Sequence, residues 1–259
     1  MAADADANIW GVIGASGTGK GLWIKQQLRD LAPPRLVVWD FKNEYQEFTG
    51  ERKHAIARRS LRQVRDAMIL AGADGPLAIR YAPHGAGEKA LRREFEGLCE
   101  LVYAWENCVF VAEELANVTT PGWAPASWRK MTTSGRHARV HIIGATQTPA
   151  LVDKSFLGNC TRVHCSALRE FAHRVAVSRS MDIPEARIAA LVKFQWLEKD
   201  FDSGEVTEGF VTVPGATKRR AATVASPSGS GADLSRQAGA KAPTLRPVAS
   251  TTTATKGRI

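Results

Sequence analysis

Short apolar runs alternate with longer amphipathic stretches along most of the chain. The runs are rich in β-branched and aromatic residues, which predicts buried strands, and the stretches between them have the length of crossover helices. This order is typical of an α/β fold in which helices flank a mostly parallel central sheet. We expect strands at residues 9–13, 36–39, 77–81, 108–112, 140–145 and 161–165, and a terminal pair near 195–197 and 210–213.

Two helices have clear sequence signals. Within residues 88–105, five apolar side chains recur at helical spacing while charges occupy the other face. Residues 20–31 predict another helix, which must end before Pro33 and Pro34 because proline does not continue a helix. The five apolar positions in the first helix are Leu91, Phe95, Leu98, Leu101 and Val102.

Composition changes sharply near the end of the chain. The 259 residues allow one α/β core, which we assign to residues 1–214. Residues 215–259 are mostly Ala, Ser, Thr, Gly and Pro, a composition that predicts disorder. Eight basic residues and one acid give this tail +7 of the net charge of +9, so the body is nearly neutral. The tail is expected either to bind DNA electrostatically or to serve as a solubilising or partner-binding extension.

Composition also bears on location and redox state. No apolar run approaches the roughly 18 residues of a membrane span, and the first residues lack a signal-peptide pattern, so we expect a cytoplasmic protein without a membrane span. The four cysteines include no C-x-x-C pair and are expected to be reduced, with Cys108 acting as a small buried hydrophobe. A zinc site at Cys160, His164 and Cys165 is disfavoured because no second ligand pair stands elsewhere at metal-like spacing.

A phosphate-binding loop follows the first predicted strand. The eight residues Gly14, Ala15, Ser16, Gly17, Thr18, Gly19, Lys20 and Gly21 fit G-x-x-x-x-G-K between a strand and a helix. Such glycines let backbone N–H groups turn towards an anion, and the helix N-terminus adds partial positive charge. We expect ATP to bind here, with Lys20 reaching the β- and γ-phosphates.

Gly21 departs from the motif, which has Ser or Thr at this position to ligate Mg²⁺. The ion is then left with indirect help from Ser16 or Thr18, or with phosphates, water and acidic side chains. This departure weakens the expectation of hydrolysis more than that of binding.

Two carboxylates, Glu113 and Glu114, come directly after the predicted strand 108–112. In a parallel sheet this is the edge that faces ligands. We expect Glu113 to hold Mg²⁺, its longer side chain partly offsetting Gly21, and Glu114 to orient or deprotonate the attacking water. The alternative interpretation is a solvated pair at a helix start.

Several segments, in the same order along the chain, resemble the FtsK/HerA superfamily of P-loop DNA pumps. Residues 134–149 include Arg136, Arg139 and the stretch Ala-Thr-Gln147-Thr-Pro, similar to that family's arginine segment and A-T-Q-x-P sensor. Residues 37–44, which include Asp40-Phe-Lys42, resemble its D-P-K segment, with Phe41 in place of Pro. Residues 113–117 are similar to its D-E-F-A-x segment, and 159–163, with Arg162, to its N-x-x-x-R strand.

The resemblance implies a RecA-like core that self-associates, often as a hexameric ring, with an arginine of one subunit contacting ATP in the next. Gln147 would then sense the γ-phosphate, and Asp40 and Lys42 would lie in the nucleotide site. Arg136, Arg139 and Arg162 are candidates for the arginine that acts in trans, and the sequence does not choose among them.

The resemblance and the small size together predict an ATPase that translocates double-stranded DNA, as in viral or mobile-element genome packaging. Its expected partners would include capsid or virion proteins. Its expected location is the host cytoplasm or the virion. One alternative is a Zot-like virion-assembly or secretion ATPase. Another is a nucleotide-binding scaffold that has lost hydrolysis, as Gly21 suggests. Trp123 and Trp128, beside Arg129 and Lys130, are candidates for contact with a partner or a nucleic acid strand.

Overall fold

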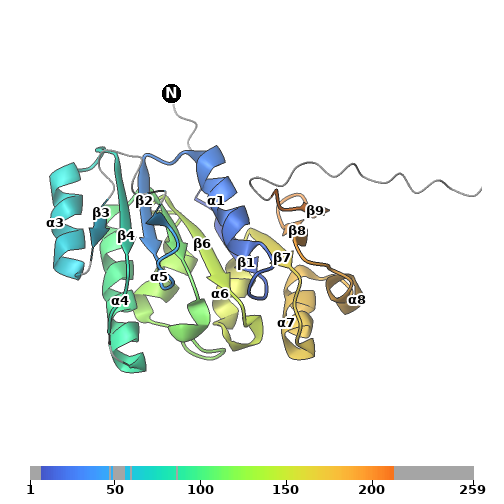
Figure 1. Ribbon diagram of the computed structural model, residues 1–259. Helices are drawn as coiled ribbons and strands as arrows, with labels where there is room; N and C mark the ends of the chain where they lie inside the picture. The colour runs from blue at the N-terminus through green and yellow to red at the C-terminus, as the bar shows by residue number, and fades with distance from the viewer. Residues whose placement is uncertain (1–6, 47, 49–55, 59, 86, 213–259) are drawn as a thin grey trace, which may run out of the picture. The chain divides into compact units, whose positions relative to one another are not determined.

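The computed structural model describes residues 7–46, 48, 56–58, 60–85 and 87–212, and a single sheet lies at its centre (Figure 1). Among these residues the strands follow the order β3-β4-β2-β5-β6-β1-β7-β8-β9 across the sheet. Neighbours from β3 to β7 pair in parallel, whereas β8 and β9 extend the sheet as antiparallel strands. The strands are β1 (Ile9–Ile13), β2 (Arg35–Trp39), β3 (Ile56–Arg58), β4 (Leu77–Tyr81), β5 (Cys108–Ala112), β6 (Val140–Thr146), β7 (Arg162–Ser166), β8 (Gln195–Asp200) and β9 (Val206–Phe210).

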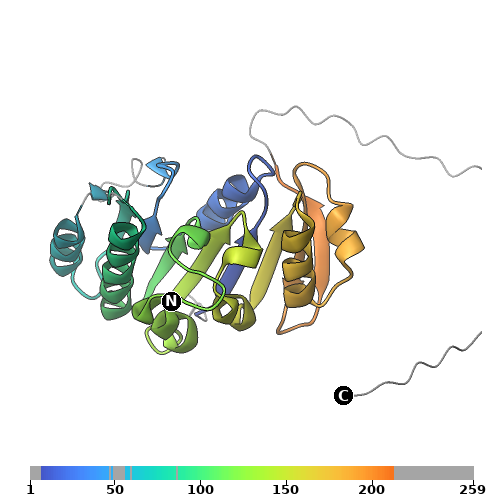
Figure 2. The same cartoon turned by 90° about the horizontal axis from the view of Figure 1, so that it is seen from below.

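Helices cover both faces of this sheet, as Figure 2 shows. On one face α1 buries Trp23, Ile24 and Leu28 against the sheet. The other face carries most of the remaining helices and the larger core cluster. The helices are α1 (Lys20–Leu31), α3 (Leu61–Ala71), α4 (Glu88–Trp105), α5 (Ala126–Ser134), α6 (Lys154–Asn159), α7 (Phe171–Met181) and α8 (Glu185–Ala189), with 3₁₀ turns η1 (Leu115–Asn117) and η2 (Pro149–Leu151).

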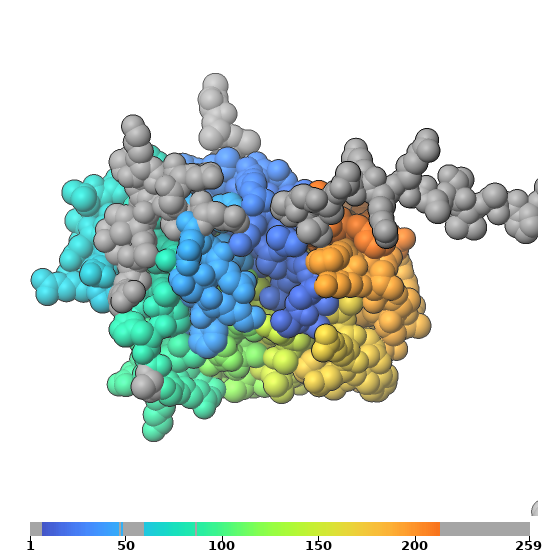
Figure 3. Space-filling model, in the orientation of Figure 1, coloured from blue at the N-terminus to red at the C-terminus, as the bar shows by residue number. Residues whose placement is uncertain are grey.

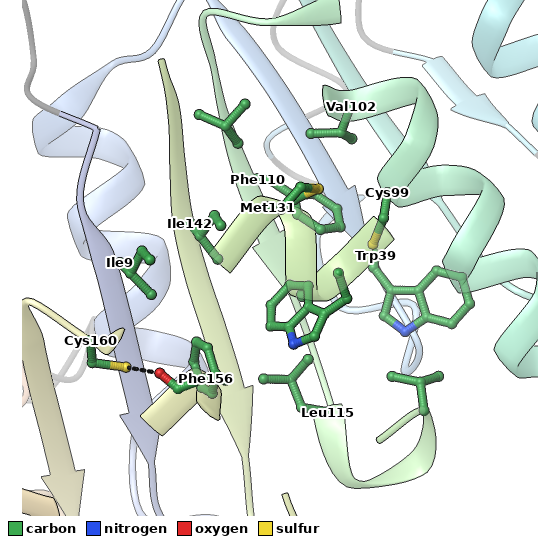
Figure 4. Packing of buried hydrophobic residues seen from close by; sticks show 14 of the residues in the cluster. Ile9, Trp39, Cys99, Val102, Phe110, Leu115, Met131, Ile142, Phe156 and Cys160 are labelled. Carbon is green, nitrogen blue, oxygen red and sulfur yellow. Dashed lines mark hydrogen bonds between the residues drawn. The ribbon is translucent and has the colours of Figure 1, made fainter. Parts of the chain in front are cut away.

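The larger core cluster is strongly aromatic (Figure 4). Trp128 on α5 is fully buried, with ring centroids 5.4 Å from those of Phe95 and Phe156. The expectation that Trp128 contacts a partner is therefore wrong, because its place on the buried face of α5 outweighs its nearness to a polar loop. Trp123, in contrast, is 42% exposed, and the guanidinium of Arg92 lies 4.6 Å from its ring centroid.

The predicted α/β class is confirmed, and five elements, β1, β4, β5, α1 and α4, have the predicted bounds. The prediction for the final strand was wrong, since β9 covers Val206–Phe210 rather than 210–213. Most side chains of this edge strand are exposed, so it lacks an apolar run. The buried Val211 follows the strand and donates its N–H to the Phe194 carbonyl at 2.8 Å. The three-residue edge strand β3 was not predicted.

All four cysteines are buried and carry free thiols. Burial raises the pKa of each of them, to about 12 for Cys108. The Cys160 thiol donates to the Phe156 carbonyl at 3.3 Å, the contact drawn in Figure 4. Cys108 therefore packs as the small hydrophobe that its sequence context predicted.

Two further expectations concern the ends of the chain and membranes. The predicted basic tail, residues 215–259, lies outside the described residues. In the part of the chain that the structure describes, no helix combines the length and the apolar character needed to cross a membrane.

Candidate functional site

The loop between β1 and α1 has the backbone that its glycines predict. Gly17 and Gly19 have φ angles of 75° and 107°, in the left-handed region that disfavours residues with a Cβ. A Cβ on Gly19 would also lie 3.1 Å from side-chain atoms of Phe194 and Val211. Both positions therefore require glycine.

The same loop presents backbone donors. The Gly14 N–H donates to the Thr146 carbonyl at 3.3 Å, which fixes the loop to the end of β6. Among the described residues, the N–H groups of Ser16, Gly17 and Gly19 donate to no protein acceptor. Helix α1 begins at the next residue, Lys20, and a helix N-terminus carries partial positive charge. The loop is therefore suited to bind an anion such as a phosphate.

A cavity of about 360 Å³ opens beside this loop. In Figure 3 the loop and the start of α1 (dark blue) lie at the surface next to the segment after β2 (mid blue). The cavity is lined by Ala15, Ser16, Gly17, Gly19, Lys20, Gly21, Leu22, Lys25, Lys42, Glu44, Gln147 and Phe194. Three lysines make it cationic, as a polyphosphate site requires.

Four of the lining side chains, those of Leu22, Lys25, Glu44 and Phe194, were not among the site residues predicted from the sequence. Glu44 stands two residues after Lys42 in the segment that carries the family resemblance, so that segment contained a signal for it. Phe194 precedes β8 and comes near Gly19 through tertiary packing alone, which no local pattern reveals.

Glu114 is the centre of the polar side chains beside the loop. Its Oε1 accepts hydrogen bonds from Lys42 Nζ at 2.6 Å and Gln147 Nε2 at 2.5 Å, and Lys20 Nζ lies 3.9 Å away. These groups come from the ends of β2, β5 and β6 and from the phosphate loop. The structure thus brings together four residues that the sequence predicted to share one site.

The backbone and charge of Glu114 are both unusual. Its φ of 52° lies in the left-handed region, a conformation that costs free energy in a residue with a Cβ and is frequent at functional sites. Burial raises the pKa of the carboxyl, but hydrogen bonds from Lys42 and Gln147 and the charge of Lys20 outweigh it, so the pKa lies below its usual value. Glu114 is therefore a carboxylate at neutral pH.

Glu113 has a different environment from its neighbour. It is 2% exposed, and its Oε1 accepts a hydrogen bond from the Tyr45 hydroxyl at 2.6 Å. Burial and the charge of Glu113 raise the pKa of Tyr45, so this hydroxyl stays protonated as a donor. The pair links the end of β5 to the segment after β2.

Asp40 is fully buried and is not part of the cavity lining. Its two carboxylate oxygens accept the backbone N–H groups of Glu44 at 2.8 Å and Tyr45 at 3.1 Å, and Arg80 pairs with it at 3.1 Å. Asp40 therefore holds the turn that presents Lys42 and Glu44 to the cavity.

The three candidate arginines lie at the opposite end of the strands from the phosphate loop. Arg136 and Arg139 are exposed in the turn before β6, and within the described residues neither guanidinium makes a hydrogen bond or ion pair. Arg162, the first residue of β7, instead pairs with Asp200 at 3.4 Å and lies 4.7 Å from the centroid of the Trp10 ring. None of them reaches the cavity of its own chain, because the five residues of β1 separate the two ends by about 15 Å.

Protein ligands for a metal are sparse. Over the described ranges, the structure contains no group of three or more His, Cys, Asp or Glu side chains that could hold a metal ion. Cys160, His164 and Cys165 therefore do not form such a group. The Thr18 hydroxyl donates to the Ala15 carbonyl at 2.8 Å. An ion in the cavity would thus take most of its ligands from phosphate and water, as Mg²⁺ commonly does.

A phage protein is similar to this chain in sequence. No protein-family model matches the sequence. The chain is 28% identical over 184 residues to Protein P9 of Pseudoalteromonas phage PM2, a match that covers 70% of this chain and 78% of that protein.

Solved structures share the fold at low sequence identity. The genome packaging NTPase B204 from Sulfolobus turreted icosahedral virus 2, in complex with ATP-gammaS, has a TM-score of 0.64 and 14% identity, covering 81% of this chain and all of that one. VirB4 of Thermoanaerobacter pseudethanolicus has a TM-score of 0.61 and 10% identity, covering 80% and 90%. The fold that the family resemblance implied is thereby confirmed.

Proposed function

We propose that this protein binds and hydrolyses ATP and uses the energy to translocate double-stranded DNA, as a viral genome-packaging ATPase. The observation that carries the proposal is the convergence of Lys20, Lys42 and Gln147 on the Glu114 carboxylate beside the phosphate loop. An acid, two cations and an amide at the γ-phosphate end of the loop are the groups that phosphoryl transfer to water requires.

In the proposed reaction the free N–H groups of the loop and Lys20 bind the β- and γ-phosphates. Glu114 accepts a hydrogen bond from the attacking water and orients it. Gln147, now bonded to Glu114, is positioned to exchange that bond for one to the γ-phosphate. Mg²⁺, when bound, would neutralise phosphate charge, with Glu113 contributing through its water shell.

The arginine end supports self-association. Exposed Arg136 and Arg139 lie too far from their own nucleotide cavity, and we propose that one of them completes the cavity of a neighbouring copy. A head-to-tail interface of this kind generates a ring when its rotation closes, and a hexamer is the number implied by the family resemblance.

For the DNA contact we propose the surface around Trp123. The exposed indole of Trp123 lines a cavity together with Arg92, Arg93 and Arg129. This surface thus combines an aromatic face with positively charged side chains. Nucleic acid strands bind such surfaces by stacking and phosphate contact. The packaging role itself rests on the similarity to B204, and it would place the protein in the host cytoplasm or at the virion, with capsid proteins as partners.

Two other functions have specific support. The fold of VirB4 matches this chain almost as closely as that of B204, so the fold does not separate the packaging function from an assembly or secretion ATPase. Gly21, which lacks the Mg²⁺-binding hydroxyl, favours a nucleotide-binding scaffold without hydrolysis.

The test is ATP turnover by the full chain with Mg²⁺, with and without double-stranded DNA. We expect DNA to stimulate turnover and Lys20→Ala to abolish it, while Lys89→Ala, an exposed position on α4, leaves it unchanged. Turnover that is insensitive to DNA would favour the assembly ATPase. ATP binding without turnover under any DNA condition would favour the scaffold.

A further inference from the structure

Gly21 leaves space at the position where the motif normally places a metal-binding hydroxyl. Among the described residues outside its own helical turn, a Cβ added to Gly21 would meet one atom within 4 Å, the Oε2 of Glu44 at 3.7 Å. The Glu44 carboxylate therefore lies where a Ser or Thr side chain at position 21 would project. A carboxylate oxygen is a ligand type that Mg²⁺ prefers.

The backbone of Glu44 is held firmly although its side chain is exposed. Its N–H donates to Asp40 Oδ1 at 2.8 Å, and Asp40 is itself fixed by Arg80. The next residue, Tyr45, is fully buried and its hydroxyl donates a hydrogen bond to Glu113 Oε1. These contacts hold Glu44 at the rim of the cavity and link it to the other predicted metal-binding acid.

Charge gives a second, independent reason to expect a cation at Glu44. It is the one acidic side chain among the residues that line the described cavity, whose other charges are Lys20, Lys25 and Lys42. Within the described residues its carboxylate accepts no hydrogen bond and forms no ion pair. A bare carboxylate would repel a bound triphosphate, and a divalent cation between the two anions would remove that repulsion.

We propose that Glu44 replaces the missing hydroxyl of Gly21 as a ligand of the Mg²⁺ that accompanies the nucleotide. This inference rests on the proposed nucleotide binding and deepens it. Glu44 would supply a protein ligand to Mg²⁺ beside the phosphates, with Glu113 contributing through the water shell. The exchange of a hydroxyl on the loop for a carboxylate in the segment after β2 also explains why the motif tolerates glycine here.

The test measures binding of ATP-gammaS to the full chain by calorimetry, once with Mg²⁺ and once with EDTA. With Mg²⁺ we expect Glu44→Gln to weaken binding by about tenfold or more, because a metal ligand is lost. With EDTA we expect the same change to strengthen binding by roughly threefold, because a repulsive charge is lost. Glu100→Gln, which removes an exposed charge on α4, should alter neither value.

A reversal of sign between the two buffers is the result that a solvated surface acid would not give. Equal effects of Glu44→Gln in Mg²⁺ and EDTA, or no effect in either, would overturn the proposal. Lys20→Ala separates this outcome from failure of the proposed function, since unchanged binding in that variant would show that ATP-gammaS does not occupy the loop at all.

Rescue provides a further check that does not depend on turnover. Gly21 is not at positive φ, and among the described residues outside its own helical turn no atom lies closer than 3.7 Å to the place of its Cβ, so Gly21→Ser fits the fold. Adding Gly21→Ser to Glu44→Gln should restore the Mg²⁺ dependence of binding. Mn²⁺ bound in the presence of ATP-gammaS, counted by paramagnetic resonance, should fall in Glu44→Gln and return in the double variant; no return would contradict the exchange of ligands.

Discussion

The two ends of the parallel strands differ in how their polar groups are satisfied. At the carboxyl end, Lys20, Lys42 and Gln147 all engage Glu114 within one chain. At the amino end, Arg136 and Arg139 are exposed and make no hydrogen bond or ion pair with the described residues. The polar side chains at the carboxyl end thus contact one another, and those at the amino end present charge outward. A single chain contains most of the proposed phosphoryl-transfer site, whereas Arg136 and Arg139 lie at the opposite end of the strands.

Arg162 shows that this difference is not a general property of the amino end. It pairs with Asp200 and Glu198 on β8 and stacks over Trp10, so it joins strands at the antiparallel edge of the sheet. The geometry favours Arg136 or Arg139 over Arg162 as the residue that acts on a neighbouring copy.

The largest effect is expected from the exposed arginine. Arg136→Ala should lower DNA-stimulated turnover by about a thousandfold, the usual worth of an arginine supplied in trans, with little change in stability. The measurement is ATP turnover beside urea unfolding. Arg162→Ala should instead lower stability to urea clearly and change turnover less than Arg136→Ala does.

Mixing variants decides whether the arginine acts between copies. Arg136→Ala mixed with Glu114→Gln should recover activity well above that of either alone, because some interfaces then combine an intact Glu114 with an intact Arg136. If the mixture stays inactive while Arg139→Ala gives recovery, Arg139 is the acting residue; recovery with neither would contradict action in trans.

The next effect concerns the organised end. Glu114→Gln should lower turnover by about a hundredfold to a thousandfold because the base that orients water is lost. Nucleotide binding should persist, since the loop and Lys20 are intact. Turnover and ATP-gammaS affinity measured on one preparation test this, and a parallel loss of both would indicate a structural role for Glu114.

A third prediction concerns two buried histidines, His141 on β6 and His164 on β7. Burial, and secondarily the charge of Arg162, lowers the pKa of His141 to about 4, and burial lowers that of His164 despite its bond to Glu198. Below about pH 6.5 these two imidazoles therefore become protonated in the unfolded chain but stay neutral in the folded chain. Stability should be constant above that pH and fall between about 6.5 and 4, by about 3 kcal/mol for His141, roughly a hundredfold in the unfolding equilibrium.

Urea unfolding across this pH range measures the effect. His141→Gln should flatten the slope whatever its effect on absolute stability, whereas His84→Gln, an exposed position, should leave the slope unchanged. An unaltered slope in His141→Gln would mean that other groups set the acid limit.

The smallest effect is expected at Lys42. Its hydrogen bond helps to keep the pKa of Glu114 low, so Lys42→Met should raise that pKa and move the acid limb of the pH–rate profile to higher pH. At neutral pH the loss should be about tenfold, as for one charge-assisted hydrogen bond. A profile that is lowered without being shifted would assign Lys42 to phosphate binding instead.

How much the sequence revealed depended on the kind of signal. Strands β1, β4 and β5 were predicted with correct bounds because both of their faces are buried, which produces continuous apolar runs. The convergence of Glu114 and Gln147 followed from the rule that parallel strands end at one edge.

What the sequence did not reveal depends on tertiary contacts. The buried role of Asp40 required knowing that the turn folds back onto its carboxylate. Phe194 contacts Gly19 although it stands 175 residues later in the chain. Most side chains of the edge strand β9 are exposed, so its sequence has no apolar run. The resemblance to the family named Lys42 but did not single out Glu44, whose position became informative once the space at Gly21 was known.

The buried cysteines have a practical consequence for the study of assembly. Because burial raises the pKa of all four thiols, they should react slowly with maleimides in the folded protein. A cysteine introduced at position 136 would then be the fastest-reacting thiol without removal of any native one. Dyes attached there would report distances between neighbouring copies by energy transfer, and a bifunctional reagent would trap their order of assembly.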